Sequence, residues 1–311
     1  MAEKEATRAA YGRKLAELGD KYDFYVLDAD LSGSTQTCVF AKKFPERFFN
    51  CGIAEENMIS VAAGIAATGV PAFASSFAMF ACGRAFEQIR NSVAYPRLRV
   101  RVCASHAGIT VGEDGATHQF CEDIAIMRAL PGMTVLVPAD SASTEAILEQ
   151  LMDYDGPAYM RLGRYAVPQV YEKGQYKFEI GKGIVVADGK DVTIAATGIM
   201  VSAAIEARAI LASEGIDAAV LDIHTVKPLD NALIAEYASK TGNIVTAEEH
   251  SVIGGLGDAV AAVVAASGSA RLAKLGVNDE FGTSASAGVL LEHYRLTAAG
   301  IVDKVKELLK K

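Results

Sequence analysis

The sequence predicts an α/β protein of two domains, each a parallel or mixed sheet flanked by helices. Short β-branched runs alternate with longer amphipathic segments, which is typical of βα units around a parallel sheet. The strand candidates are almost continuously apolar, as expected when helices cover both faces of a sheet. The chain has 311 residues, 51% of them hydrophobic, which is enough for two cores of the usual ~150-residue size.

The first domain is expected over residues 1–180 and the second over residues 186–311. Expected strands cover residues 24–27, 71–75, 99–104, 134–137 and 159–162, then 192–196, 218–223, 244–247 and 272–277. Expected helices cover residues 3–18, 55–68, 79–95 and 141–152, then 201–213, 231–240, 257–266 and 297–309. Between the two sets, residues 165–182 carry Pro168, Gly174 and Gly181 among charged residues, which indicates a linker.

Composition excludes several classes of protein. The 38 acidic residues outnumber the 30 basic ones, giving a net charge of -8, which argues against a nucleic-acid or anionic-membrane surface. No apolar run reaches the ~18 residues that span a bilayer, and the charged N-terminus lacks the apolar segment of a secretory signal. The five cysteines are scattered without a Cys-x-x-Cys pair, which predicts reduced thiols and a cytoplasmic location.

Ligands of α/β sheets gather beyond the carboxyl ends of strands, and polar segments follow several predicted strands. Residues 28–34, with Asp30 and Ser34, fit either a helix cap or a ligand loop. Glu55 and Glu56 open a helix that is apolar on nearly every face. Such a pair ordinarily compensates the helix dipole. Because this helix is expected to be buried, one carboxyl group is expected to be buried with it, as a candidate for proton exchange.

Three further segments carry candidate side chains. Phe77 and Phe80 share a helical face, either as plain core or as a platform for a flat heterocycle. Residues 105–119 form a glycine-rich loop with two histidines and two acids, and the absence of His-x-x-His or a cysteine partner disfavours zinc. Arg164 ends a strand, where it serves a surface ion pair or binds phosphate or carboxylate. The residues alone indicate an enzyme acting on a sugar phosphate or using a cofactor. The glycines of residues 254–257 lack the lysine and spacing of a phosphate loop and indicate a tight turn.

Together these segments resemble the C-terminal half of the transketolase family of thiamine-diphosphate enzymes. Gly-Ile-Ala-Glu-Glu-Asn-Met at residues 52–58 resembles the cofactor-activating motif, and Gly-Glu-Asp-Gly-Ala-Thr-His-Gln at residues 112–119 resembles the sugar-binding loop. Residues 222–230 and 248–251 resemble the family's C-terminal domain. The resemblance implies a pyrimidine-binding fold followed by that domain. It also implies a transferase that moves a two-carbon ketol unit between sugar phosphates, in carbohydrate metabolism of the pentose phosphate type.

The resemblance also implies roles for single residues. Glu55 matches the glutamate that hydrogen-bonds the cofactor's aminopyrimidine ring, where a shared proton helps to make the cofactor nucleophilic. Phe80, with Phe77 behind it, matches the aromatic residue that stacks on that ring, and Asp30 matches a residue near the cofactor. His118, a second catalytic candidate, and Asp114 match groups that bind sugar hydroxyls. The remaining substrate candidates match a phosphate-binding set; they are Arg8, Ser34, His106 and Arg164.

The family's metal-binding motif is missing from this sequence. The diphosphate-binding domain carries Gly-Asp-Gly and a later asparagine, and no Gly-Asp-Gly occurs here. The resemblance therefore implies that a separate N-terminal transketolase subunit holds the Mg²⁺ or Ca²⁺, that this chain holds no metal, and that this chain self-associates as a dimer. Three alternatives stay open: the beta chain of a two-oxo-acid dehydrogenase, a deoxyxylulose-phosphate-synthase-like enzyme, and a non-catalytic scaffold subunit.

Overall fold

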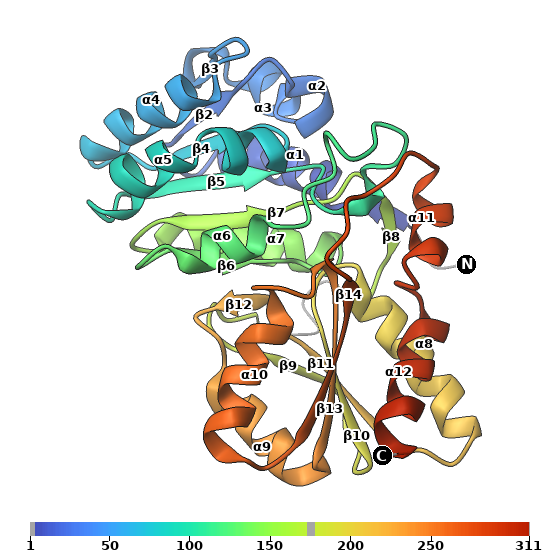
Figure 1. Ribbon diagram of the computed structural model, residues 1–311. Helices are drawn as coiled ribbons and strands as arrows, with labels where there is room; N and C mark the ends of the chain where they lie inside the picture. The colour runs from blue at the N-terminus through green and yellow to red at the C-terminus, as the bar shows by residue number, and fades with distance from the viewer. Residues whose placement is uncertain (1–3, 173–177, 311) are drawn as a thin grey trace.

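The computed structural model describes residues 4–172 and 178–310, and the first half of this part builds most of a seven-stranded sheet of order β12-β6-β7-β5-β4-β2-β3 (Figure 1). The strands are β2 (Tyr25–Asp28), β3 (Phe48–Asn50), β4 (Ala72–Ser75), β5 (Val100–Ala104), β6 (Thr134–Leu136), β7 (Ala158–Arg161) and β12 (Thr225–Lys227). All neighbours pair in parallel except β12, which is antiparallel to β6. The central strands β4 and β5 are buried along their whole length, as expected from their largely apolar sequences. Arg101 of β5 is the charged exception in these two strands, and its Nε atom donates to the Leu151 carbonyl at 3.1 Å.

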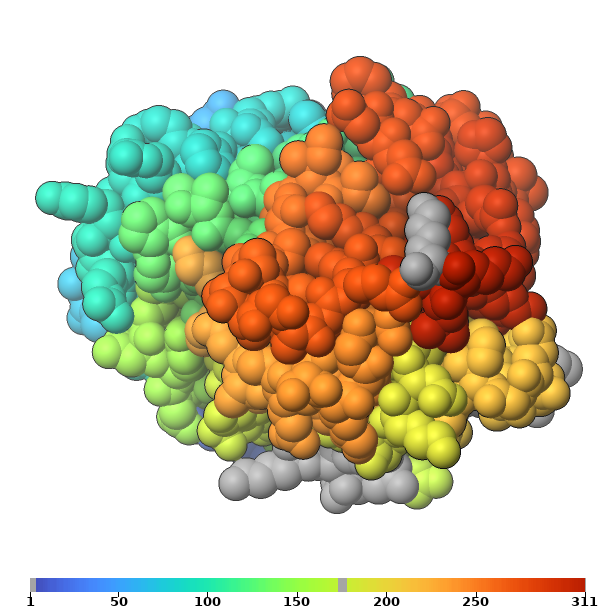
Figure 2. Space-filling view, turned by 60° about the horizontal axis from the view of Figure 1, so that its bottom comes forward, coloured from blue at the N-terminus to red at the C-terminus, as the bar shows by residue number. Residues whose placement is uncertain are grey.

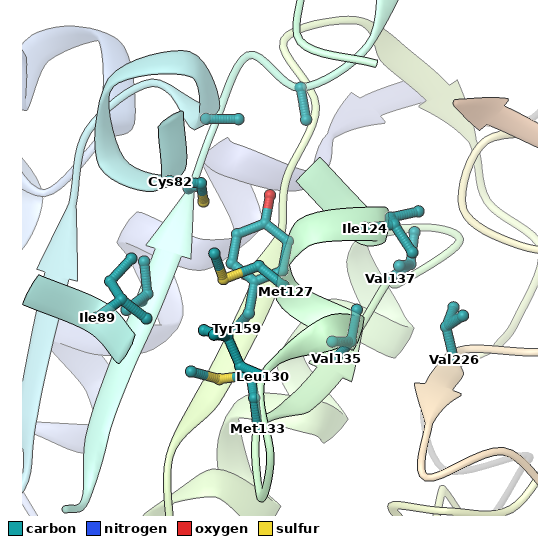
Figure 3. Close-up of a cluster of buried hydrophobic side chains, with 14 of the residues drawn as sticks. Cys82, Ile89, Ile124, Met127, Leu130, Met133, Val135, Val137, Tyr159 and Val226 are labelled. Atoms are coloured by element: carbon teal, nitrogen blue, oxygen red, sulfur yellow. The ribbon is translucent and has the colours of Figure 1, made fainter. Parts of the chain in front are cut away.

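Helices cover both faces of this sheet. They are α1 (Thr7–Leu18), α2 (Ser32–Thr35), α3 (Cys38–Lys43), α4 (Glu55–Ala67), α5 (Phe86–Gln88), α6 (Asp123–Ala129) and α7 (Ser141–Asp153). On one face, Tyr11 and Leu15 of α1 and Leu148 of α7 belong to one buried cluster. On the other, α4 and α6 contribute to a second cluster, in which Met127 lies close to Tyr159 of β7 (Figure 3). The sheet is therefore the middle layer of three.

The second half forms a five-stranded sheet of order β14-β13-β10-β11-β9. Its strands are β9 (Ile184–Ala187), β10 (Val192–Ala196), β11 (Ala218–Asp222), β13 (Asn243–Ser251) and β14 (Arg271–Val277), and its helices are α8 (Met200–Ser213), α9 (Asn231–Thr241), α10 (Leu256–Ser267), α11 (Ala287–His293) and α12 (Ala298–Lys310). The strands run parallel except β9, which is antiparallel to β11. Among the described residues, no helix is long and apolar enough to cross a membrane.

The two halves are joined by more than the connecting segment. β12 belongs to the second half by sequence, but it completes the edge of the first sheet, and Val226 packs into the same buried cluster as Val135 (Figure 3). Figure 2 shows the second half, orange to red, packed directly against the green and cyan first half. Because side chains of both halves fill this boundary, groups from the second half can reach the loops of the first sheet.

The structure differs from the sequence prediction at the start of the chain. The helix predicted over residues 3–18 begins only at Thr7, because residues Lys4–Ala6 form strand β1. This strand pairs antiparallel with β8 (Ala166–Pro168), so the segment interpreted as a linker also contains a strand. Residues 173–177 of that segment lie outside the described residues. A pairing between positions so far apart in sequence overrides the local helix propensity.

Two predicted helices also differ from expectation. The segment predicted as one helix over residues 79–95 consists of π-helical turns at Met79–Arg84 and Ile89–Ala94 on either side of α5. A π-turn inserts an extra residue, which apolar spacing alone does not reveal. Helix α4 is not buried all round, since Val61 is 39% exposed and Ile53, just before the helix, is 78% exposed. One side of α4 therefore faces outward in the single chain.

Candidate active site

Most candidate residues lie in loops at one edge of the first sheet. Phe77 follows β4, His106 follows β5 and Arg164 follows β7. These three strands are parallel neighbours, so the loops at their carboxyl ends adjoin. Backbone hydrogen bonds join two of the loops directly, since Ser105 N donates to the Ser76 carbonyl at 3.0 Å and Ala78 N donates to the Ser105 carbonyl at 2.7 Å. The topology thus brings together residues far apart in sequence.

Glu55 is the first residue of α4 and is buried, as expected for one of the two glutamates that open this helix. A carboxylate at this position also interacts favourably with the helix dipole. Arg84 Nη1 donates to Glu55 Oε2 at 2.8 Å, and the Arg84 guanidinium lies 5.0 Å from the centre of the Phe80 ring. The role of Arg84 was not predicted. The available signal was its position four residues after Phe80, a spacing that places two side chains on one helical face.

Four rings form a cluster beside this ion pair. The rings of Phe77 and Phe80 are near-parallel, with centroids 5.9 Å apart. His106 stacks on Phe77 at 3.7 Å, and His118 meets Phe80 edge-on at 5.4 Å. Phe77 is buried and Phe80 is half-buried, so the cluster combines a fixed inner ring with an accessible outer one. The sequence predicted the pair of phenylalanines, and the structure adds both histidines to it.

His106 is held in one protonation state by its surroundings. It lies in the left-handed region at φ 56° and is buried. Its Nε2 atom faces Arg8 Nη1 at 3.4 Å and its Nδ1 atom faces Ser105 Oγ at 2.9 Å. Because arginine can only donate, Nε2 accepts and Nδ1 carries the proton. Burial, with the nearby cations Arg8 and Arg164, lowers the pKa of His106 to about 3. The ring is therefore neutral at physiological pH.

Two arginines converge near His106. Arg8 N donates to the Gly163 carbonyl at 3.4 Å, so Arg8 lies beside the residue that precedes Arg164. Burial, and after it the positive charge of Arg164, lowers the pKa of Arg8. Arg8 Nη1 also donates to the Ser34 carbonyl at 2.7 Å. Arg164 Nη1 donates to the Val111 carbonyl and lies 3.5 Å from Glu113 Oε2. Repulsion between neighbouring cations favours an anion between them, so this is a candidate anion site. Glu113 was not among the predicted residues, and Ser34 meets Arg8 through its backbone oxygen.

Two predicted residues lie apart from these groups. Asp114 is exposed on the loop that carries His118. Asp30 is also exposed, has a φ of 62°, and accepts a hydrogen bond from Asn50 Nδ2 at 2.8 Å. Among the described residues, no group of three His, Cys, Asp or Glu side chains is arranged to hold a metal ion.

The comparisons with known proteins cover nearly the whole chain. Residues 3–169 match the family model of the transketolase pyrimidine-binding domain, and residues 181–301 match that of the transketolase C-terminal domain. The chain is 52% identical over 307 residues to a "Putative transketolase C-terminal section" from Methanocaldococcus jannaschii, covering 98% of this chain and 96% of the relative. It is 43% identical over 307 residues to a 6-deoxy-6-sulfo-D-fructose transketolase subunit from a Clostridium species, covering 98% and 95%. A solved structure described as "Split gene transketolase, inactive beta4 tetramer" matches with a TM-score of 0.92 and 53% identity, covering 98% of both chains.

Proposed function

Because this chain belongs to the transketolase family, as the C-terminal section of a split enzyme, we propose that it works as one subunit of a two-chain, thiamine-diphosphate-dependent transferase. The enzyme would transfer a two-carbon ketol unit from a ketose phosphate to an aldose phosphate. The observation that carries this proposal is the match along almost the full length of relatives that are themselves sections or subunits. Carbohydrate metabolism in the cytoplasm, as in the pentose phosphate pathway, is the setting we propose.

The donor set beside α4 fits the aminopyrimidine end of thiamine diphosphate. That ring needs a carboxyl group able to share a proton and an aromatic face for stacking. Glu55 supplies the first from a buried position, and half-buried Phe80 supplies the second. Arg84 bridges them, since it contacts both Glu55 and Phe80. When bound, the cofactor supplies a nucleophilic carbon that attacks the ketose carbonyl.

We assign a role to each candidate residue near the cofactor. Glu55 Oε2 is held by Arg84, so we assign Oε1 to the proton shared with the ring. Phe80 fixes the plane of the ring, and Phe77 supports Phe80 from behind. His118 lies edge-on to Phe80, where it would hydrogen-bond hydroxyl groups near the reacting carbons. Asp114, on the same loop, would bind another hydroxyl group of the substrate. Asp30 remains a proposed contact near the cofactor.

We assign the candidate anion site to the far end of the substrate. Arg8 and Arg164 would bind its phosphate, and the neutral His106 ring beside Arg8 would add no further positive charge. Bidentate contacts between guanidinium groups and phosphate oxygens are charge-assisted and directional. Ser34 borders the same site through its contact with Arg8. A substrate that carries an anionic group remote from the reacting carbonyl fits this layout.

A partner chain would complete the site. This sequence contains no Gly-Asp-Gly, so we place Mg²⁺ or Ca²⁺ and the diphosphate on a separate N-terminal subunit. The outward side of α4, with Val61 and nearby Ile53 exposed, provides an apolar surface next to Glu55 for a second chain. Self-association of this chain as a dimer is part of the same proposal.

Calorimetric titration and reconstitution test this assignment. The purified chain, titrated with thiamine diphosphate and Mg²⁺, should show no tight binding, because contacts to the aminopyrimidine alone do not hold a charged diphosphate. Adding a chain that carries Gly-Asp-Gly should produce both tight binding and ketol transfer from a ketose phosphate. Tight stoichiometric binding by this chain alone would contradict the two-chain proposal.

A further inference from the structure

The loop that carries both active-site histidines rests on the second half of the chain. This loop, residues 105–120, follows β5 and lies beside α11 (Figure 1). Its turn Ile109–Val111 is buried. Gln119 Nε2 donates to the Gly112 carbonyl within the loop at 3.2 Å and to the Thr283 carbonyl of the second half at 2.9 Å. Residues of the second half therefore help to fix the conformation of this loop.

Glu249 makes the most direct of these contacts. It lies on β13 of the second half and is 3% exposed. Its Oε1 atom accepts a hydrogen bond from Thr110 N at 2.7 Å. A charged acceptor for a buried backbone N–H gives one of the stronger hydrogen bonds in a protein. Since Thr110 stands between His106 and His118 in the loop, this contact fixes the middle of the segment whose ends carry the two rings.

Arg161 holds the Glu249 side chain from the first sheet. Its Nη1 atom lies 3.6 Å from Glu249 Oε2, and its Nη2 atom donates to the Glu249 carbonyl at 2.7 Å. Arg161 Nε also donates to Asp123 Oδ2 at 2.8 Å. Although burial alone would lower the pKa of Arg161, the carboxylates of Asp123 and Glu249 raise it, so the guanidinium stays charged. Arg161 of the first sheet thus orients the carboxylate of Glu249, and this carboxylate in turn accepts the hydrogen bond from Thr110 N in the loop.

Gly108 shows how closely the loop approaches this carboxylate. Its φ is +78°, a conformation that favours glycine. A Cβ atom at this position would lie 2.4 Å from Glu249 Oε1, which is far inside van der Waals contact. The loop therefore passes over Glu249 with space only for a residue without a side chain, and the two positions form one fitted contact.

We propose that Glu249 is a positioning residue. From the second half of the chain, it holds the loop in the conformation that places His106 and His118 in the active site. The second half would thereby take part in substrate binding without touching the substrate. The effect on substrate binding rests on the proposed function, whereas the effect on the loop does not.

Glu248 offers a matched control on the same strand. It is buried like Glu249, but its oxygens accept from Leu256 N at 2.7 Å and Gly257 N at 2.8 Å, at the start of α10. Neighbouring residues of a strand point to opposite faces, so the two carboxylates serve different sides of β13. Removal of either carboxylate costs stability, but only the loss of Glu249 should release the loop.

Hydrogen exchange of the purified chain tests the loop directly. In Glu249→Ala, we expect amides around Thr110 to exchange ten- to a hundredfold faster, the range for losing a hydrogen bond to a charged group. Glu249→Gln keeps an acceptor for Thr110 but turns an amide group toward Arg161, so its effect should be smaller. Gly108→Ala, which disturbs the same contact from the loop side, should also speed exchange. Glu248→Ala should leave exchange in the loop unchanged.

Kinetics of the two-chain enzyme test the consequence for the substrate. Glu249→Ala and Glu249→Gln should raise KM for a ketose phosphate, in that order of severity, while the Kd for thiamine diphosphate stays near that of the wild type. Unchanged loop exchange in Glu249→Ala, or equal loop exchange and equal KM in the Glu248 and Glu249 variants, would overturn the proposal. If the chain proved not to support ketol transfer at all, the exchange result would still decide whether Glu249 positions the loop.

Discussion

Replacement of Arg164 by alanine in the two-chain enzyme tests the candidate anion site most directly. If the substrate carries a phosphate, Arg164 and Arg8 bind it together, and a donor without phosphate never makes that contact. Arg164→Ala should therefore raise KM for phosphorylated ketoses and leave the kinetics of unphosphorylated donors nearly unchanged. Arg164→Lys should restore only part of the loss, because a point charge lacks the planar fork of the guanidinium.

The structure sets the expected size of this effect. A charge-assisted hydrogen bond is worth about 1.5–3 kcal/mol. The Arg164 side chain is 39% exposed and already shares its charge with Glu113 at 3.5 Å, and solvent weakens such contacts. The lower part of the range, about 1.5–2 kcal/mol, corresponds to an increase in KM of roughly ten- to thirtyfold. Arg8 is half-buried like Arg164 and also binds the Ser34 carbonyl, so its loss should raise KM by a similar factor.

Arg13 provides the control for this experiment. It lies on α1, as Arg8 does, and pairs with Glu5 and with Glu145, away from the ring cluster. Arg13→Ala should leave KM unchanged for both kinds of donor. The assay is steady-state ketol transfer with phosphorylated and unphosphorylated donors, together with thermal unfolding of each variant. Equal damage to both donors by Arg164→Ala, with a matching fall in melting temperature, would refute the phosphate assignment and leave only a structural ion pair.

Two further predictions concern Glu55 and His224. Glu55→Gln in the two-chain enzyme should lower kcat by ~10²–10⁴-fold, the usual contribution of a positioned proton donor, whereas Glu56→Gln should change it little; similar kcat values would assign the role to another acid. His224 lies between β11 and β12 and is fully buried. Burial lowers its pKa to about 4, so protonation near pH 6.5 favours the unfolded chain. The free energy of unfolding should therefore fall as pH drops from about 6.5 to 4. His224→Gln should remove about 3 kcal/mol of that fall, measured by urea unfolding at each pH; an unchanged pH dependence would contradict this.

Much of the sheet architecture could be predicted from the sequence because its signals are local. Buried parallel strands read as continuous apolar runs, and β4, β5 and β10 are buried throughout. The sequence does not predict β12, because the signal for this strand is not local. It is only three residues long, and it exists because Thr225 pairs with Leu136 across the boundary between the two halves. No pattern within those three residues encodes a partner so far away in sequence.

The features of the candidate site also fall into those that local sequence predicts and those that depend on distant contacts. The spacing of Phe77 and Phe80 and the acid at the start of α4 are local signals, and the structure brings out the stacked rings and the buried Glu55. The stacking of His106 on Phe77 and the contact of Arg8 with Gly163, next to Arg164, depend instead on the order of the strands. That order is set by the packing of the whole sheet, which the motif containing each residue does not specify.

Glu249 shows most clearly that contacts distant in sequence determine a residue's role. In the sequence it is one of two adjacent glutamates, and the resemblance marks the pair without distinguishing its members. The alternation of side chains along β13 separates them, since Glu248 serves α10 and Glu249 serves Thr110 on the loop of the first half. A buried carboxylate needs an ion-pair partner and hydrogen-bond donors, and here they are Arg161 and Thr110 N of the loop that carries the histidines. The boundary between the two halves of the chain is thus also a surface that shapes the candidate active site.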